Sequence, residues 1–282
     1  MPSLIYTWES LRDEKNNDQL IELISQSSFI NQRVLTIVHI RTAHYAVFKV
    51  STVSDSYVVR MGIVNDQLYM PSNNGFLDTA TNIMHDQMFE FEMGQYIHSN
   101  TDSVICPIHY ERIHTAVDLM WLPFITDDAN AISTQKWFEV LSSFHDIKRV
   151  AKLPVFNNRQ KTMNRLKALP PETSKILAAQ YDELLDDLFR CATRWGVVHG
   201  DVHRDNAINV TDRTFLYDLD TVSWGPQVWD ITHLAYRYGK NGNTGYSIDS
   251  LRHMLGYSEE EFEVAVRLRS LASEVARLYN NI

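Results

Sequence analysis

The sequence predicts an α+β fold in two lobes, a strand-rich first lobe and a larger helical second lobe. Short β-rich runs separated by polar turns occupy the first third of the chain. These runs lie at residues 34–40, 45–50 and 57–61. After Pro123 the apolar residues recur at helical spacing instead. This change of pattern predicts a first lobe over residues 1–118, a hinge over 119–123 and a helical lobe over 124–282.

Helices and two further strands complete the predicted first lobe. An apolar stripe that begins at Leu20 predicts a helix ahead of the strands. A second helix is expected over residues 84–97, with Glu90 on the face that also carries its apolar residues. Two more strands are expected at residues 104–108 and 116–121.

The second lobe carries the sequence signals of at least three helices. One apolar stripe begins at Trp137. A second stripe follows Pro171 and has Gly196 as its expected end. The last helix is expected to begin after Ser258, in a capping-box pattern, and to run to about Tyr279.

Composition and charge narrow the classes of function. The net charge of −9 repels phosphate backbones, which argues against nucleic-acid binding and favours cationic partners. No run approaches the roughly 18 apolar residues that a membrane helix needs. The two cysteines, Cys106 and Cys191, lie far apart, which suits a reducing cytoplasm. Neither an HExxH zinc motif nor a Gly-x-Ser-x-Gly nucleophile motif is present.

A hairpin is expected to bring Asn206 and Asp218 together. Residues 207–210 and 214–217 are short β-like runs around a three-residue loop, 211–213. This register sets Asn206 opposite Asp218, and directly opposed residues of antiparallel strands share one face. A shift of the register by one residue would turn the pair to opposite faces.

The residue types around this hairpin suit phosphoryl transfer. An amide oxygen from Asn206 and a carboxylate from Asp218 are hard oxygen ligands of the kind that Mg²⁺ prefers. Asp201 lies five residues before Asn206, on the loop that enters the hairpin. A carboxylate there could accept a proton from an attacking hydroxyl while the other two residues hold the metal.

The motif segments resemble those of a known family. His199-Gly-Asp-Val-His-Arg-Asp-Asn206, followed by Leu216-Tyr-Asp-Leu-Asp220, resembles the catalytic and metal-binding motifs of the aminoglycoside phosphotransferase and choline kinase family, relatives of protein kinases. Trp224-Gly-Pro-Gln-Val-Trp-Asp-Ile231 is similar to the segment that follows in such kinases. The resemblance covers about residues 30–235. It implies a protein-kinase-like fold, with a small antiparallel-sheet lobe, a helical lobe and ATP bound between them.

The resemblance also assigns phosphate contacts in the first lobe. Arg60, in Tyr57-Val-Val-Arg-Met61, stands where the family usually presents a phosphate-binding lysine. Arginine is a competent bidentate donor to phosphate. Glu90 is the expected ion-pair partner of Arg60, with Glu92 as the competitor.

The adenine contacts are assigned in the same way. Residues 118–123 resemble the hinge that binds adenine through its backbone, which here means Met120, Trp121 and Leu122. The expected phosphate-covering loop, residues 41–45, has no glycine and so departs from the family pattern.

Four residues near the motif have supporting or open roles. His199 is expected to support the loop as a buried imidazole, and His203 is similar but could also contact phosphate. Asp230 is expected to anchor the loop by accepting hydrogen bonds from its backbone. Asp220 could reach a second metal ion or cap the turn, and the sequence leaves both roles open.

The sequence therefore predicts an ATP- and Mg²⁺-dependent kinase that phosphorylates a hydroxyl of a small molecule, with GTP left open as the donor. The acidic balance favours a cationic, amino-bearing acceptor. An aminoglycoside or amino sugar is the first expectation, and choline or another amino alcohol is the alternative. A non-catalytic nucleotide-binding regulatory module is the alternative from another class. A protein kinase is disfavoured, because the 11 residues between Asp218 and Asp230 are too few for a peptide-binding activation segment.

Overall fold

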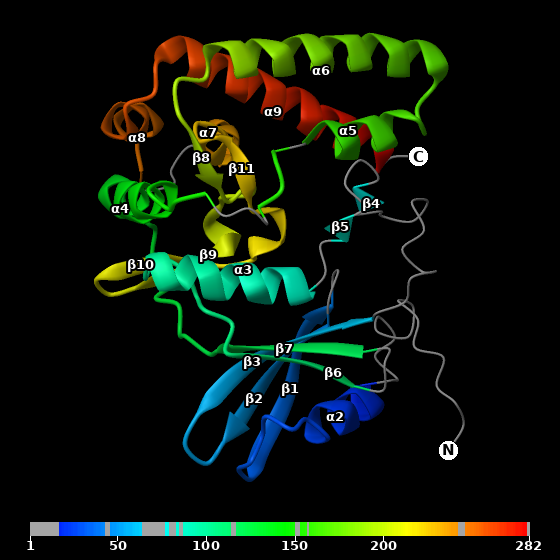
Figure 1. The fold of residues 1–282 in the computed structure, drawn as a ribbon, viewed down its shortest axis with the longest axis vertical. Helices are drawn as coiled ribbons and strands as arrows, with labels where there is room; N and C mark the ends of the chain where they lie inside the picture. The colour runs from blue at the N-terminus through cyan, green and yellow to red at the C-terminus, as the bar shows by residue number, and fades with distance from the viewer. Residues whose placement is uncertain are drawn as a thin grey trace. The chain divides into compact units, whose positions relative to one another are not determined.

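The computed structural model describes most of the chain, and its elements are labelled in Figure 1. The described residues are 17–42, 46–63, 77–78, 83–84, 87–113, 117–149, 153–156, 158–241 and 246–280. They form two compact units. The first unit contains the described residues within Met1–Gly75, His85–His98 and Ile105–Ile125. The second contains those within Phe76–Met84, Ser99–Val104 and Thr126–Ile282.

The first unit is built on a five-stranded antiparallel sheet with the strand order β1-β2-β3-β7-β6. Its strands are β1 (Val34–Thr42), β2 (Ala46–Thr52), β3 (Ser56–Ile63), β6 (His109–Ile113) and β7 (Val117–Pro123). Helix α2 (Asn17–Ser25) packs its apolar stripe into one core with side chains from these strands, among them Phe48 and Met61. Because successive side chains of a strand point to opposite faces, Arg60 faces away from that core. Helix α3 (Gln87–Asn100) also belongs to this unit up to His98.

The second unit is mainly helical. Its helices are α4 (Thr134–His145), α5 (Asn158–Leu166), α6 (Pro171–Cys191), α7 (Trp229–Asn241), α8 (Ile248–Leu255) and α9 (Glu259–Tyr279). Helix α9 packs against α5, α6 and α7, and Figure 1 shows it running beside α6. The predicted cap of α9 is present, since Ser258 Oγ accepts a hydrogen bond from the Glu261 N–H (3.2 Å), while the Glu261 carboxylate accepts from the Ser258 hydroxyl.

Three two-stranded antiparallel sheets and two short 3₁₀ helices complete the second unit. The strand pairs are β4 (Leu77–Asp78) with β5 (Ile83–Met84), β8 (Trp195–Val198) with β11 (Ser223–Pro226), and β9 (Ala207–Val210) with β10 (Arg213–Leu216). The 3₁₀ helices are η2 (Arg204–Asn206) and η3 (Leu219–Thr221). The predicted α+β class, with an antiparallel sheet ahead of a helical part, is confirmed.

Two predictions about single elements are wrong. The strand expected at residues 104–108 is not formed, and the strand that pairs with β7 is β6 instead. Pro107 has no N–H to give to a ladder, which disfavours the earlier segment. The second stripe ends at Cys191, at the end of α6, and not at Gly196. Gly196 lies in β8, where a Cβ would overlap the Gln227 side chain.

The predicted register of the β9–β10 hairpin is also wrong, by one residue. Arg213 pairs with Val210 and Leu216 with Ala207, so the turn has two residues and not three. The shorter turn moves every residue of β10 by one place relative to β9. Asn206 and Asp218 are therefore not directly opposed in a ladder, as the three-residue loop would have made them.

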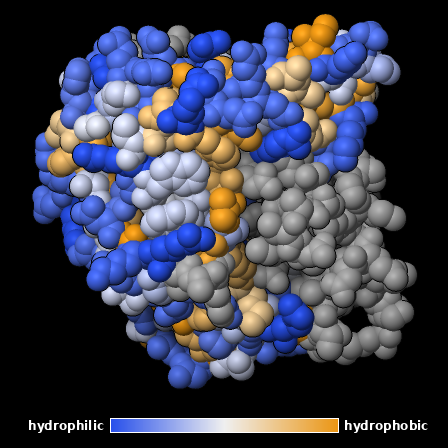
Figure 2. Space-filling view, turned by 45° about the horizontal axis from the view of Figure 1, so that its top comes forward, coloured by the Kyte–Doolittle hydropathy of each residue, from blue (hydrophilic) through white to orange (hydrophobic). Residues whose placement is uncertain are grey.

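The surface in Figure 2 is mostly hydrophilic where the described residues are drawn, with hydrophobic residues in small groups among them. Among the helices that the structure describes, none is both long enough and apolar enough to cross a bilayer.

Candidate active site

The sequence motif forms a loop that follows strand β8. The loop begins at His199 and continues through η2 into β9. Gly200 has a φ of +86°, in the left-handed region that glycine adopts without strain. A Cβ at Gly200 would also lie 2.8 Å from the Thr221 carbonyl oxygen. The backbone therefore requires glycine at the position immediately before Asp201.

Asp230, fully buried in the first turn of α7, holds the backbone of this loop. Its carboxylate accepts hydrogen bonds from the N–H groups of His199 (2.9 Å) and Gly200 (2.8 Å). The carboxylate also lies 3.0 Å from Nε2 of His145, whose Nδ1 is 3.0 Å from the Tyr257 hydroxyl. A buried carboxylate with three donors is satisfied. The backbone contacts predicted for Asp230 are thus present.

Three further side chains bind the carbonyl groups of the loop. Thr221 donates to the carbonyl of His199 (2.7 Å). The carbonyl of Gly200 accepts from the Trp229 indole (3.0 Å) and from the Arg269 guanidinium (2.9 Å). The guanidinium lies 4.1 Å from the centre of the Trp229 ring, and burial lowers the pKa of Arg269. Residues 20 to 70 positions further along the chain therefore bind both the N–H groups and the carbonyl groups of the loop.

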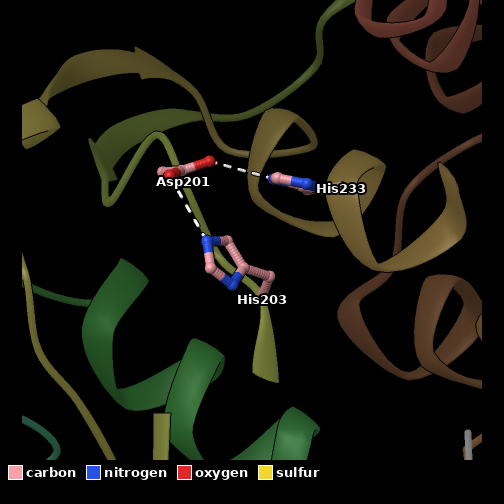
Figure 3. Close-up of side chains that lie close together, drawn as sticks. All are labelled: Asp201, His203 and His233. Atoms are coloured by element: carbon pink, nitrogen blue, oxygen red, sulfur yellow. Dashed lines mark hydrogen bonds and ion pairs between the residues drawn. The ribbon is translucent and has the colours of Figure 1, made fainter. Parts of the chain in front are cut away.

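The Asp201 side chain is held between two imidazoles (Figure 3). One carboxylate oxygen lies 2.9 Å from Nδ1 of His233, and the other lies 3.4 Å from Nε2 of His203. Burial by itself would raise the pKa of Asp201, but the hydrogen bonds from His203 and His233 outweigh it and hold the pKa well below its usual range. The side chain is 38% exposed. The site therefore presents an ionised carboxylate that a ligand can still reach.

His233 contacts Asp201 and is a residue of the candidate site that the sequence analysis missed. It lies in α7, three residues after Asp230, and so on the same side of the helix. Burial lowers the pKa of His233, while the Asp201 carboxylate opposes that shift. The imidazole is therefore neutral at pH 7, and its Nδ1–H donates to the carboxylate, which can only accept. Because Asp230 was expected to face the loop, the spacing could have predicted that His233 also does.

Asn206 adjoins Asp201 at the end of η2 and is buried. Its amide nitrogen donates to the main-chain carbonyl of Asp201 (3.0 Å). Because a carbonyl only accepts, this contact fixes which end of the amide is nitrogen. Within the described part of the chain, no donor is bonded to the amide oxygen Oδ1. That oxygen is directed away from the Asp201 backbone and is suited to a cation.

Asp218 lies beside Asn206 at a turn and not in a ladder. Tyr217 donates its N–H to the carbonyl of Asn206 (3.1 Å) and so takes the position predicted for Asp218. Asp218 follows with φ 66° and ψ 63°, a left-handed conformation that costs a non-glycine residue about 1 kcal/mol. Such strain concentrates at functional sites. Asp218 and Asp220 are both half-buried, and the metal-binding roles of both stay predictions.

The two motif histidines join the segments of the site. His199 is fully buried, with Nδ1 3.4 Å from the Asp201 N–H and Nε2 2.9 Å from the carbonyl of Tyr217. His203 accepts the Asp205 N–H at Nδ1 (3.1 Å) and caps η2. Both imidazoles therefore support the loop. The contact of His203 with phosphate stays a prediction.

The first unit brings together the phosphate-site residues that were predicted there. Arg60 in β3 forms a buried ion pair with Glu90 in α3, with 2.6 Å between its Nη1 and Oε1. The ion-pair partner of Arg60 is thus Glu90, as predicted. Glu92, the competing candidate, is half-buried in the same helix. Met120 lies directly opposite Arg60 in the register of β3 and β7.

The proposed adenine-binding backbone lies in the sheet. Met120, Trp121 and Leu122 are buried residues of β7. The carbonyl of Trp121 accepts the Ile108 N–H (2.7 Å) and is already paired. Adenine binding by this segment stays a prediction. Residues 43–45 of the expected phosphate-covering loop lie outside the described residues.

Comparison with solved structures shows which fold this is. The chain is similar to the choline kinase LicA from Streptococcus pneumoniae, with a TM-score of 0.67 and 13% identity over 94% of this chain and 91% of that one. It is also similar to the amicoumacin kinase hAmiN bound to AMP-PNP and Ca²⁺ (TM-score 0.66, 15% identity, 97% and 88% covered). A third similar structure is the spectinomycin phosphotransferase APH(9)-Ia bound to ADP and its antibiotic (TM-score 0.61, 13% identity, 92% and 86% covered). The fold is therefore that of the protein-kinase-like small-molecule kinases.

Sequence comparison gives the family. No curated protein sequence matches the chain. The model of the phosphotransferase enzyme family matches residues 121–262, which is half of the chain and includes the whole Asp201 loop with Asp230, Thr221 and Trp229, which hold it. This chain belongs to the phosphotransferase enzyme family, as the motif around Asp201 predicts.

Proposed function

We propose that the chain transfers the γ-phosphoryl group of ATP to a hydroxyl of a small, amino-bearing molecule in a Mg²⁺-dependent reaction. The observation that carries the proposal is the Asp201 carboxylate, which is partly exposed, held between two imidazoles and adjoined by Asn206. An aminoglycoside or amino sugar is the first expectation for the acceptor, and choline or another amino alcohol is the alternative. The similar kinases act on choline, amicoumacin and spectinomycin, which are all small molecules.

Asp201 is the residue that would orient the acceptor. In the proposed step, the acceptor oxygen bonds to the γ-phosphorus, the bond to the β,γ-bridging oxygen breaks and ADP leaves. Asp201 accepts the hydrogen bond of the attacking hydroxyl and then its proton. The low pKa of Asp201 makes it a weak base, so orientation is its larger contribution. This suits a reaction whose catalysis is mostly positioning and electrostatic stabilisation.

Asn206 and Asp218 are the residues that would hold Mg²⁺. The donor set fits, because both supply hard oxygens and the amide of Asn206 is fixed with Oδ1 turned from the protein backbone. When bound, Mg²⁺ neutralises charge on the phosphates. Arg60, fixed by Glu90, would bind the α- and β-phosphates.

The net charge of −9 supports a cationic acceptor. A negative field raises the local concentration of amines and polyamines and speeds their association. Because the charge is spread over the whole chain, it favours the class of acceptor and does not select one molecule.

The test is an acceptor panel. ATP or GTP is mixed with the chain, Mg²⁺ and each of several aminoglycosides, amino sugars, choline and ethanolamine, and products are read by mass spectrometry. The expected result is one acceptor class that gains a single phosphoryl group, with matching ADP release. Tight ATP binding without any acceptor-dependent ADP release would instead support the non-catalytic module.

The metal part of the proposal has its own control. Chelation of Mg²⁺, or the substitution Asp218→Ala, should abolish acceptor-dependent turnover while the chain remains folded. Turnover near the wild-type level in Asp218→Ala would remove that aspartate from the site.

A further inference from the structure

The Asp201 side chain and the two histidines around it form a set of metal-ligand atoms. Among the residues that the structure describes, this group brings three candidate ligand atoms within 4.8 Å of one another. They are a carboxylate oxygen of Asp201 and one ring nitrogen each of His203 and His233, which point toward one another in Figure 3. The 2.9 Å distance joins one carboxylate oxygen to Nδ1 of His233, and the 3.4 Å distance joins the other oxygen to Nε2 of His203. Ligands at about 2.0–2.2 Å from one ion lie about 3.3–3.6 Å apart at tetrahedral angles, so small rotations of these side chains would let the three groups share an ion.

The group is open enough for an ion to enter. The side chains of Asp201, His203 and His233 are 38%, 11% and 18% exposed. Their backbones are fixed, since Asp201 follows the anchored Gly200 and His233 lies in helix α7. An ion held by three protein ligands would complete its shell with water.

The donor types select the kind of ion. Two imidazole nitrogens and one carboxylate suit Zn²⁺, Co²⁺, Ni²⁺ and Fe²⁺, whereas Mg²⁺ prefers oxygen ligands. The neighbouring residues Asn206 and Asp218 offer only oxygens. The two sets therefore differ in the class of ion that they favour, although they adjoin.

Both histidines can present the required lone pair. His233 donates its Nδ1 proton to Asp201, and that proton can move to Nε2 because either tautomer of a neutral imidazole is accessible. His203 now accepts the Asp205 N–H at Nδ1. To bind an ion at Nε2 it must carry its proton on Nδ1, which lies 3.6 Å from the carboxylate of Asp205. That carboxylate is exposed and can take the new hydrogen bond, the usual partner arrangement of a metal-bound histidine.

We propose that Asp201, His203 and His233 bind one divalent transition ion of the Zn²⁺ class, and that the bound ion inhibits phosphoryl transfer. Inhibition follows because the ion would occupy the carboxylate that faces the acceptor hydroxyl. The inhibition rests on the proposed function, whereas the binding does not.

Binding is tested with Zn²⁺ and Co²⁺ alone, in the absence of nucleotide and Mg²⁺. Competition with a chromophoric chelator measures Zn²⁺ affinity, and visible absorption reports nitrogen–oxygen coordination of Co²⁺. We expect one ion per chain, and an affinity loss of about 100-fold or more in His233→Phe, beyond the 10- to 100-fold typical of outer-sphere partners. His253→Phe, the same change at an exposed histidine of α8, should leave the affinity unchanged. Unaltered binding in His233→Phe would overturn the site.

A measurement on the wild type keeps the test independent of how the variants fold. In nitrogen NMR of the histidine side chains, Zn²⁺ should shift one Nδ1 and one Nε2 resonance, those of His233 and His203. Zn²⁺ that leaves these two imidazoles unshifted contradicts the proposal.

Inhibition is read separately, at free Zn²⁺ concentrations set by a metal buffer because ATP also binds Zn²⁺. Turnover should fall as the site fills and return on chelation with Mg²⁺ in excess, and His233→Phe should need about 100-fold more Zn²⁺. Binding without inhibition would overturn the inhibitory half and count against Asp201 as the acceptor-facing group. Absence of binding would overturn the site whatever the turnover.

Discussion

The two units hold their candidate functional groups by different means. In the second unit, the loop of Asp201 is fixed through its backbone, by Asp230 on the N–H groups and by Arg269 on a carbonyl. In the first unit, Arg60 is fixed through its side chain, by a charge pair with Glu90. The loop that carries Asp201 is thus positioned by hydrogen bonds to its backbone, whereas the guanidinium of Arg60 is positioned by its ion pair.

Because of this difference, substitutions in the two units should affect stability in different ways. When a backbone anchor such as Asp230 is removed, buried N–H groups lose their acceptor, and this lowers the free energy of unfolding of the unit. A charge pair such as Arg60–Glu90 leaves a single buried charge, and removing both partners together can restore much of the loss. Substitutions in the two units should therefore differ in whether a second change compensates the first.

The largest effect is expected for Asp230→Ala. This change leaves the N–H groups of His199 and Gly200 without their acceptor and His145 without its partner, so the free energy of unfolding should fall by about 4 kcal/mol. Urea unfolding measures it. Asp186→Ala, at an exposed position of α6, should change the same quantity by less than about 0.5 kcal/mol. Equal stabilities of the two variants would contradict the backbone anchor.

A somewhat smaller effect is expected in the first unit. Arg60→Met leaves Glu90 buried without its charge partner and should lower the free energy of unfolding by about 3 kcal/mol. The double change Arg60→Met with Glu90→Leu should be more stable than Arg60→Met alone, although both should bind ATP more weakly than the wild type. Additive losses in the double variant would show that the pair is not held by charge.

His233 tests the orientation of the Asp201 side chain. His233→Leu removes the donor on Asp201, and the kcat should fall by about 10-fold or more with a smaller change in the acceptor KM. His233→Asn places an amide N–H near the position of Nδ1 and should recover most of that loss. If the leucine and asparagine variants are equally active and equally stable, the hydrogen bond has no role in orientation.

The smallest effect is expected at Ser258, which contacts neither the Asp201 loop nor the Arg60–Glu90 pair. Ser258 caps α9, so Ser258→Ala should lower the free energy of unfolding by about 1 kcal/mol. The kcat should not change, because the hydrogen bonds of Ser258 Oγ are made with Glu261, which has no role in the proposed reaction. A loss of turnover at unchanged stability would show that α9 does more than support the loop.

Contiguous signals explain most of what the sequence predicted. The motif from His199 to Asn206 is local, so its loop could be predicted without long-range contacts, and the Arg60–Glu90 pair was predicted from the resemblance of these two segments to the family. The start of α9 at Ser258 was predicted from four successive residues and likewise needed no long-range contact.

Long-range packing explains what the sequence did not predict. The hairpin register failed because Thr211-Asp212 forms a two-residue turn without the glycine that usually marks one. Arg269 reaches Gly200 from 69 residues away, and no local pattern indicates such a contact. His233 had a usable signal in its spacing from Asp230, but only once α7 itself was recognised.

The most direct test of the account is turnover in Asp201→Asn. Asparagine keeps the size of the side chain but accepts no proton, so the kcat should fall by about 10²- to 10⁴-fold while ATP binding and stability are retained. Asp212→Asn, the same change at the exposed turn of the neighbouring hairpin, should leave the kcat unaltered. A kcat for Asp201→Asn that matches the kcat for Asp212→Asn would contradict the assignment of Asp201 as the group that orients the acceptor.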